Sequence, residues 1–216
     1  MDFSVIDFAL VTKLLLLLLI GMGPKIALVP FLEKTKNFDA ETQRAVGRRM
    51  VVVAVVTALV LFAFGGLLMR LLHISGGAVA VAGGIVLGFL AINMVVGHGK
   101  KAVEEQLVVQ DDPAKIAIYP LAIPYLLNPV GITILIVASD EVASVASIGL
   151  VLGLVLLVGA FDYLIFANID KLAKRLNPTG LVISEVVFGI LLMAVAVQLA
   201  VSGLGSLGII APSTAH

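Results

Sequence analysis

Apolar residues gather in six long runs separated by short polar segments. Each run is about as long as the ~20 residues that a helix needs to cross the hydrocarbon core of a bilayer. None shows the strict alternation of a β-barrel strand. The pattern therefore predicts an all-α integral membrane protein with six transmembrane helices in one membrane domain. The predicted spans are Asp7–Phe31, Met50–Leu72, Gly76–Gly97, Ile116–Ala138, Val142–Phe166 and Gly180–Gly203.

The first and fourth spans are interrupted, at Gly21–Pro24 and at Asn128–Gly131. Proline lacks an N–H, and its ring clashes with the carbonyl four residues earlier. The carbonyls of Ile20 and Tyr125 therefore lose their helical partners. The residue before each proline is disfavoured in helical geometry and suits the N-cap of a new half-helix. We expect both spans to consist of two half-helices.

The start of such a half-helix predicts a binding site for a carboxylate, because it presents free N–H groups and the positive end of the helix dipole. Irregular backbone persists at membrane depth only where it is buried in protein or lines a cavity. The alternative is that the prolines merely kink packed helices, but two breaks at matching positions favour a substrate site. The candidate substrate-binding residues are Gly23, Pro24, Asn128, Pro129, Gly131 and Thr133 at the breaks, with Asn93 in span three and Gln198 in span six. The alternative role of these last two amides is to bond each other or to hold helices together.

The two halves of the chain align at an offset of 105 residues. The offset matches Pro24 with Pro129, Gly84 with Gly189 and Asn93 with Gln198. It divides the chain into repeat one (1–97), a cytoplasmic loop (98–115) and repeat two (116–216). Because each repeat has three spans, an odd number, the second copy enters the membrane upside-down. The sequence thus predicts a 3+3 inverted repeat with broken first and fourth helices, a plan found in many secondary transporters.

Composition agrees with a membrane protein and narrows its chemistry. Hydrophobic residues make up 61% of the 216 residues and charged residues 13%, against about 25% charged in soluble domains. Mean hydropathy is +1.17. There is no cysteine and the net charge is zero, so thiol chemistry is excluded and nothing suggests a nucleic-acid partner. Without a catalytic, nucleotide-binding or metal motif, we expect no enzyme activity, cofactor or metal.

Basic residues predict the orientation in the membrane. Eleven of the 14 lysines and arginines fall in loops one, three and five. The positive-inside rule therefore places these three loops in the cytoplasm and both termini outside. The segment 39–49 reads as a short polar helix that leads into span two.

Three charged residues lie within predicted spans near their cytoplasmic ends: Lys25, Asp162 and Glu185. A charge inside the bilayer is costly and marks a functional candidate. The three could meet at one depth as a gate or a proton-linked cluster. Equally, each side chain could extend to the inner headgroups.

Several segments resemble the MarC family. They are Tyr119–Pro124 (YPLAIP), Asn128–Thr133 (NPVGIT), His73–Ser75 with Val81–Ile85 (VAGGI), and Phe188–Leu191 (FGIL). The resemblance implies a six-span protein of the LysE-like superfamily that transports small neutral amino acids such as glycine and alanine. Three positions, in two segments, depart from the family pattern. Gly23 and Lys25 stand where the family has Asn or Asp before the first proline and a short polar residue after it, and Ala80 replaces a basic residue.

Together these features predict a secondary transporter of a small zwitterionic solute in a prokaryotic inner membrane, coupled to H⁺ or Na⁺. Two alternatives remain: an exporter or channel for another small solute or ion on the same scaffold, and a membrane scaffold that transports nothing.

Overall fold

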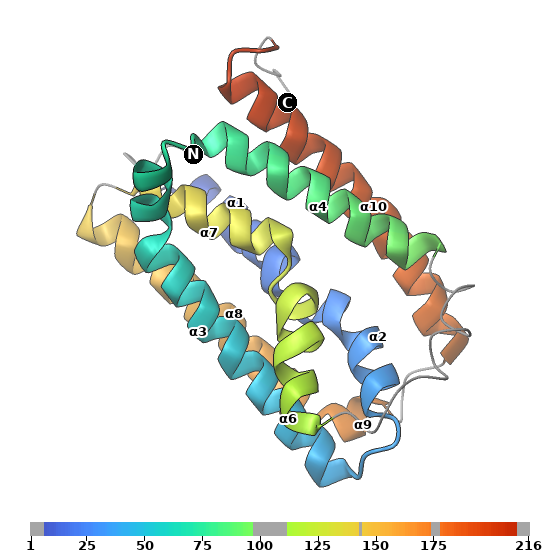
Figure 1. Ribbon diagram of the computed structural model, residues 1–216. Coiled ribbons are helices and arrows are strands. Elements are labelled where there is room, and N and C mark those ends of the chain that lie inside the picture. Colours follow the sequence, from blue (N-terminus) through green and yellow to red (C-terminus); the bar gives the residue numbers. More distant parts are fainter. Residues whose placement is uncertain (1–6, 97–111, 143, 174–177, 211–216) are drawn as a thin grey trace.

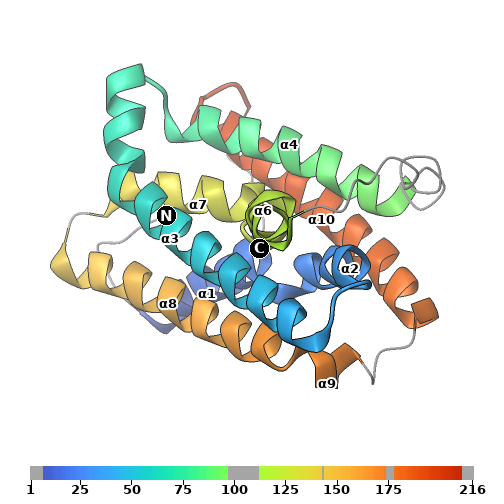
Figure 2. The ribbon, with the colours of Figure 1, turned by 60° about the horizontal axis from the view of Figure 1, so that its bottom comes forward.

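The computed structural model describes residues 7–96, 112–142, 144–173 and 178–210, and within these ranges it contains helices and their connections but no strand (Figures 1 and 2). The helices are α1 (Phe8–Met22), α2 (Pro24–Thr35), α3 (Ala40–Leu72), α4 (Gly76–Val96), α6 (Pro113–Ile116), the wide-turn helix η3 (Ala117–Leu126), α7 (Pro129–Glu141), α8 (Val145–Ala167), α9 (Ile169–Ala173) and α10 (Pro178–Ser206).

These helices supply five or six candidate membrane spans. Five segments of the described chain are long and apolar enough to cross a bilayer: 8–35, 40–72, 76–96, 145–167 and 186–206. A sixth span forms if Pro113–Leu126 and Pro129–Glu141, which meet at a bend of 72°, count as one. The predicted all-α membrane architecture is confirmed at this level, and each predicted span coincides with a helix or a pair of half-helices.

Both expected breaks occur where the prolines predict them. In the first span, α1 ends at Met22 and α2 begins at Pro24. The fourth span restarts at Pro129 after Asn128. Further irregularity lies in η3, where Tyr119 and Ile123, the residues before Pro120 and Pro124, leave helical geometry. The polar segment 39–49 is the first part of the 33-residue helix α3.

Two antiparallel helix pairs flank the broken helices (Figure 1). Along the α3–α8 seam, a Cβ added to Gly47 would lie 2.9 Å from the Cβ of Phe166, so the helices approach closely. The α4–α10 pair is equally tight, because a Cβ on Gly77 would lie 2.8 Å from the carbonyl oxygen of Gly203. Small residues allow such close packing in membranes, where lipid gives helices little hydrophobic reason to associate.

The interior divides into two apolar clusters, with the broken helices between them. The larger cluster joins α1, α2, α3, η3, α7 and α8, and includes the buried Leu14, Phe31, Met50 and Phe166. The smaller cluster joins α4 and α10 to α2 and α7. Figures 1 and 2 both show α4 and α10 side by side, on the opposite side of α1 and α7 from α8. The α4–α10 pair therefore forms a unit packed against the breaks.

Candidate functional site

The break before α7 is closed by its own N-cap. Asn128 is fully buried. Its Oδ1 accepts hydrogen bonds from the N–H groups of Val130 at 2.9 Å and Gly131 at 3.4 Å. An asparagine N-cap satisfies the first N–H groups of a helix in this way. The expectation that this half-helix start presents free N–H groups to a solute is therefore wrong for these two groups.

The same asparagine joins the two breaks to each other. Its Nδ2 donates to the carbonyl oxygen of Ile20 at 2.6 Å, and its backbone N–H donates to the carbonyl oxygen of Gly21 at 2.8 Å. Ile20 is the residue whose carbonyl Pro24 deprives of a helical partner. The carbonyl released at the first break thus binds the side chain that caps the second.

Two glycines bring the backbones of α1 and α7 into contact beside this asparagine. A Cβ on Gly131 would lie 2.5 Å from the carbonyl oxygen of Gly21, and one on Gly21 would collide with the Cα of Gly131. Neither position has room for a side chain. The two broken spans therefore cross with their main chains touching, and we call residues 20–23 and 128–131 the crossing.

The break before α2 lacks a side-chain cap. Gly23 adopts an extended conformation (φ −81°, ψ 162°), and Pro24 opens the helix. A Cβ at Gly23 would collide with the carbonyl oxygen of Leu19, so a capping side chain has no room there. The exposed Lys25 follows, and its Nζ lies 3.9 Å from the ring centroid of Phe188 on α10. This half-helix start thus combines an uncapped N-terminus with a cation.

The other predicted site residues lie at different distances from the crossing. Pro129 is buried within it, and Thr133, 3% exposed, lies one turn further along α7. The Thr133 hydroxyl occupies the space that a side chain at Gly83 on α4 would need. Thr133 is therefore the point at which the α4–α10 pair touches α7.

Asn93 and Gln198 are not brought together. Both are exposed, and the Nε2 of Gln198 donates to the Oγ of Ser202 on its own helix at 3.3 Å. Antiparallel packing places Ala91 beside Gly189, so Asn93 lies near that level of α10. Gln198 lies nine residues beyond Gly189 on α10, which is roughly 13 Å along the helix at ~1.5 Å per residue.

The three charged candidates do not form a cluster among the described side chains. Asp162 is fully buried on α8, and neither of its carboxylate oxygens has a hydrogen-bonding partner within the described residues. It therefore makes no ion pair with Lys25. The side chain of Glu185 lies outside the described part of the structure.

Three contacts near these residues were not foreseen from the sequence. The ammonium group of Lys25 lies over the ring of Phe188. The rings of Phe31 and Phe166 pack with their centroids 5.1 Å apart, and Arg70 forms an ion pair with Asp140 at 3.0 Å. The last contact ties α3 to the far end of α7. No local pattern signals such contacts, because each joins residues from separate spans.

Comparison with known proteins agrees with this architecture. A family model described as MarC family integral membrane protein matches residues 8–207. The chain belongs to the MarC family. The UPF0056 membrane protein of Methanocaldococcus jannaschii is 28% identical over 184 residues, covering 85% of this chain and 90% of that protein. The UPF0056 membrane protein of Chlamydia muridarum is 31% identical over 170 residues, covering 77% of this chain and 78% of that protein.

A third MarC relative, the UPF0056 membrane protein of Pyrococcus horikoshii, is 26% identical over 204 residues, covering 91% of this chain and 98% of that protein. The relatives come from archaea and bacteria, and their names state a membrane protein without a substrate. No solved structure matches the chain.

Proposed function

We propose that this MarC protein is a secondary transporter of small neutral amino acids such as glycine and alanine. The observation that carries the proposal is the crossing, where two broken spans meet and are joined by the buried amide of Asn128. Backbone of this kind survives at membrane depth only when it is buried in protein or lines a cavity. Discontinuous helices that meet near the midplane are typical of substrate sites in transporters.

An inverted 3+3 repeat is part of the proposal, and the α4–α10 pair supports it. A Cβ on Gly84 would lie 2.7 Å from the oxygen of Ala196, and one on Gly189 would lie 3.1 Å from the oxygen of Ala91. The 105-residue offset converts Gly84 into Gly189 and Ala91 into Ala196. The two contacts are therefore exchanged by the repeat, as a two-fold axis in the membrane plane requires.

The solute carboxylate binds at the start of α2 in this proposal. That start has no side-chain cap, whereas Asn128 already occupies the first N–H groups of α7. Lys25 adds a positive charge beside it.

Alternating access arises from movement of the α4–α10 pair against the broken helices. This pair contacts them through the Lys25–Phe188 and Gly83–Thr133 contacts and through the smaller apolar cluster. The distribution of basic residues supports placing both termini outside, with loops one, three and five in the cytoplasm of a prokaryotic inner membrane. Coupling to H⁺ or Na⁺ completes the proposal, with Lys25, Asp162 and Glu185 as candidate residues.

Counterflow in proteoliposomes tests the proposal. Vesicles loaded with unlabelled glycine should take up labelled glycine and alanine, while vesicles loaded with glutamate or lysine should not exchange them. Uptake that rises in proportion to the external glycine concentration without saturating, and that internal glycine does not accelerate, would indicate a channel. Absence of exchange across the whole panel of amino acids would contradict transport of neutral amino acids.

A further inference from the structure

Asp162 is a buried carboxyl group without a hydrogen-bonding partner. It lies on α8, five residues before the helix ends at Ala167, and is 0% exposed. Neither carboxylate oxygen has a hydrogen-bond partner in the described structure. Buried polar groups in proteins are normally paired. An unpaired one therefore calls for an explanation in terms of function.

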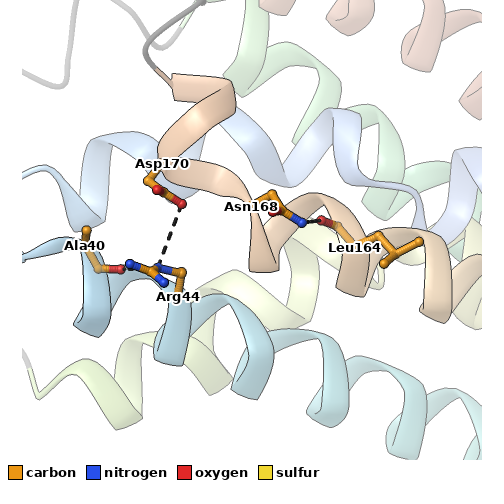
Figure 3. A network of polar contacts seen from close by, with 5 residues as sticks. All are labelled: Ala40, Arg44, Leu164, Asn168 and Asp170. Carbon is orange, nitrogen blue, oxygen red and sulfur yellow. Dashed lines mark hydrogen bonds and ion pairs between the residues drawn. The ribbon is translucent and has the colours of Figure 1, made fainter.

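The seam between α3 and α8 shows what surrounds this carboxyl group. Towards the end predicted to be cytoplasmic, Arg44 on α3 pairs with Asp170 on α9 at 3.8 Å (Figure 3). Further along the seam, Gly47 packs against Phe166, and beyond Asp162 the side chain of Val55 packs against Gly159. Asp162 shares the face of α8 that carries Phe166 and Gly159, because the three residues are spaced by three and four. Apolar contacts therefore lie above and below it.

The charged groups on neighbouring elements do not neutralise Asp162. Titratable or charged side chains occur on the elements packed against α8 and next to Asp162 on α8 itself. They are Asp7 and Lys13 at α1, Lys25, Glu33 and Lys34 on α2, Glu41, Arg44, Arg48, Arg49 and Arg70 on α3, Asp170 and Lys171 on α9, and Tyr163 on α8. None of them reaches the Asp162 oxygens. Arg44, which lies on the α8-facing side of α3, is bound to Asp170.

A proton is the ligand that this environment suits. An ionised carboxylate in apolar surroundings without partners is strongly disfavoured, and the group takes up a proton instead. A sodium ion would need several oxygen ligands, whereas the side chains that pack one helical turn to either side of Asp162, those of Phe166 and Val55, are apolar. We propose that Asp162 is the proton-binding site that couples solute movement to the proton gradient.

Two aromatic rings close this site towards the end of α8. Phe166 lies one helical turn beyond Asp162 and packs against Phe31, with ring centroids 5.1 Å apart and planes at 55°. Both residues are 0% exposed. The pair separates the carboxyl group from the end of the helix that the basic residues place in the cytoplasm. The structure thus holds the proton site shut on that side.

The aromatic pair also connects the proton site to the crossing. Phe31 belongs to α2, whose first residue, Pro24, lies at the uncapped break. A solute that binds the start of α2 and shifts this half-helix moves Phe31 away from Phe166. Movement of one short helix would therefore open the route to Asp162. This step rests on the proposed transport function.

Transport assays separate this inference from the function on which it rests. In proteoliposomes, Asp162→Asn should retain glycine counterflow but lose the accumulation of glycine that an imposed pH gradient drives in the wild type. Asp140→Asn, which changes a carboxylate at the other end of the molecule, should retain both activities. Absence of counterflow in the wild type would defeat the transport function itself. Accumulation by Asp162→Asn equal to that of the wild type, or a wild type driven by sodium alone, would overturn the assignment of Asp162.

Carbodiimide labelling tests the site without measuring transport, even if Asp162→Asn does not fold. The apolar reagent dicyclohexylcarbodiimide reacts with protonated carboxyl groups in apolar surroundings, and peptide mapping by mass spectrometry should find the adduct on Asp162. A water-soluble carbodiimide should label Asp162 in Phe31→Ala but not in the wild type or in the lipid-facing control Phe64→Ala. An unlabelled Asp162 in wild-type vesicles treated with the apolar reagent would overturn the proton site, and equal labelling of Phe31→Ala and wild type by the water-soluble reagent would overturn the aromatic closure.

Discussion

The two breaks have the same backbone conformation but differ in their hydrogen bonds. Gly23 and Asn128 both adopt extended geometry, with φ and ψ of −81° and 162° in one and −90° and 172° in the other, and a proline follows each. Asn128 caps its helix and also binds the opposite break. Gly23 caps nothing. One break is therefore a structural joint, and the other lacks a side-chain cap.

A steric cause underlies this difference. At position 128 the side chain extends towards α1 and finds the free carbonyl of Ile20. At position 23 the carbonyl oxygen of Leu19 occupies the place of a Cβ. The family resemblance leads one to expect Asn or Asp before the first proline, and this chain has glycine there. The backbone angles of the two breaks are therefore alike, while only the break at Asn128 has a side-chain cap.

The largest effect is expected where the two breaks touch. Gly21→Ala places a methyl group against the backbone of Gly131, and because backbone cannot rotate away, the crossing has to separate. Overpacking costs about 1–3 kcal/mol and occasionally more, so we expect a markedly lower melting temperature in detergent and loss of transport.

Gly153→Ala is the matched control for this variant, because nothing lies within 4 Å of a Cβ at that position of α8. It should melt at or above the wild-type temperature, since alanine is favoured over glycine in a helix by roughly 0.5–1 kcal/mol. Equal melting temperatures for Gly21→Ala and the wild type would show that the crossing is looser than described.

Removal of the joint should have the next largest effect. Asn128→Ala loses an N-cap, at a cost of about 0.5–2 kcal/mol, and leaves the partly buried carbonyl of Ile20 without its side-chain partner, at a cost of at most about 1–3 kcal/mol. We expect reduced thermal stability and severely reduced counterflow, with membrane insertion less affected. Asn128→Ser retains a capping oxygen but cannot reach the opposite break as a donor.

Comparing these two variants separates the cap from the joint. If the joint matters for transport, Asn128→Ser should recover stability more than it recovers counterflow. Counterflow at the wild-type rate in Asn128→Ala would remove Asn128 from the site.

Local chemistry in the sequence predicts the breaks but not their connection. Proline geometry foretells that Ile20 loses its helical partner, and the amide of Asn128 identifies it as an N-cap. Nothing local indicates that these two residues, 108 positions apart, bind each other. Position in the sequence likewise could not decide whether Asp162 extends to the headgroups or is buried. Its burial depends on packing between α3 and α8, which requires contacts between distant spans.

A smaller effect, confined to solute binding, is expected at the break before α2, which lacks a side-chain cap. Lys25→Met removes the cation beside the uncapped start of α2, so we expect the KM for glycine to rise about tenfold, equivalent to ~1.4 kcal/mol. The lost contact with Phe188 is worth only about 0.5–1 kcal/mol at an exposed position, so the melting temperature should hardly change. Lys25→Arg should preserve the KM because it keeps the charge.

Lys34→Met, which removes an exposed lysine at the far end of the same helix, is the control for position. An unchanged KM in Lys25→Met would place the carboxylate elsewhere. A fall in melting temperature as large as that of Asn128→Ala would instead assign Lys25 a structural role.

The smallest effects are expected for the two amides that the repeat matches but the fold separates. Asn93 and Gln198 are exposed and lie far apart along the α4–α10 pair, and Gln198 bonds Ser202 on its own helix. Substitutions at exposed positions that take no part in core packing or helix capping change stability by less than about 0.5 kcal/mol. Asn93→Ala and Gln198→Ala should therefore leave both counterflow and melting close to wild type. If either variant lost counterflow while melting normally, the solute path would run along α4 and α10, and the crossing would not be where the solute is selected.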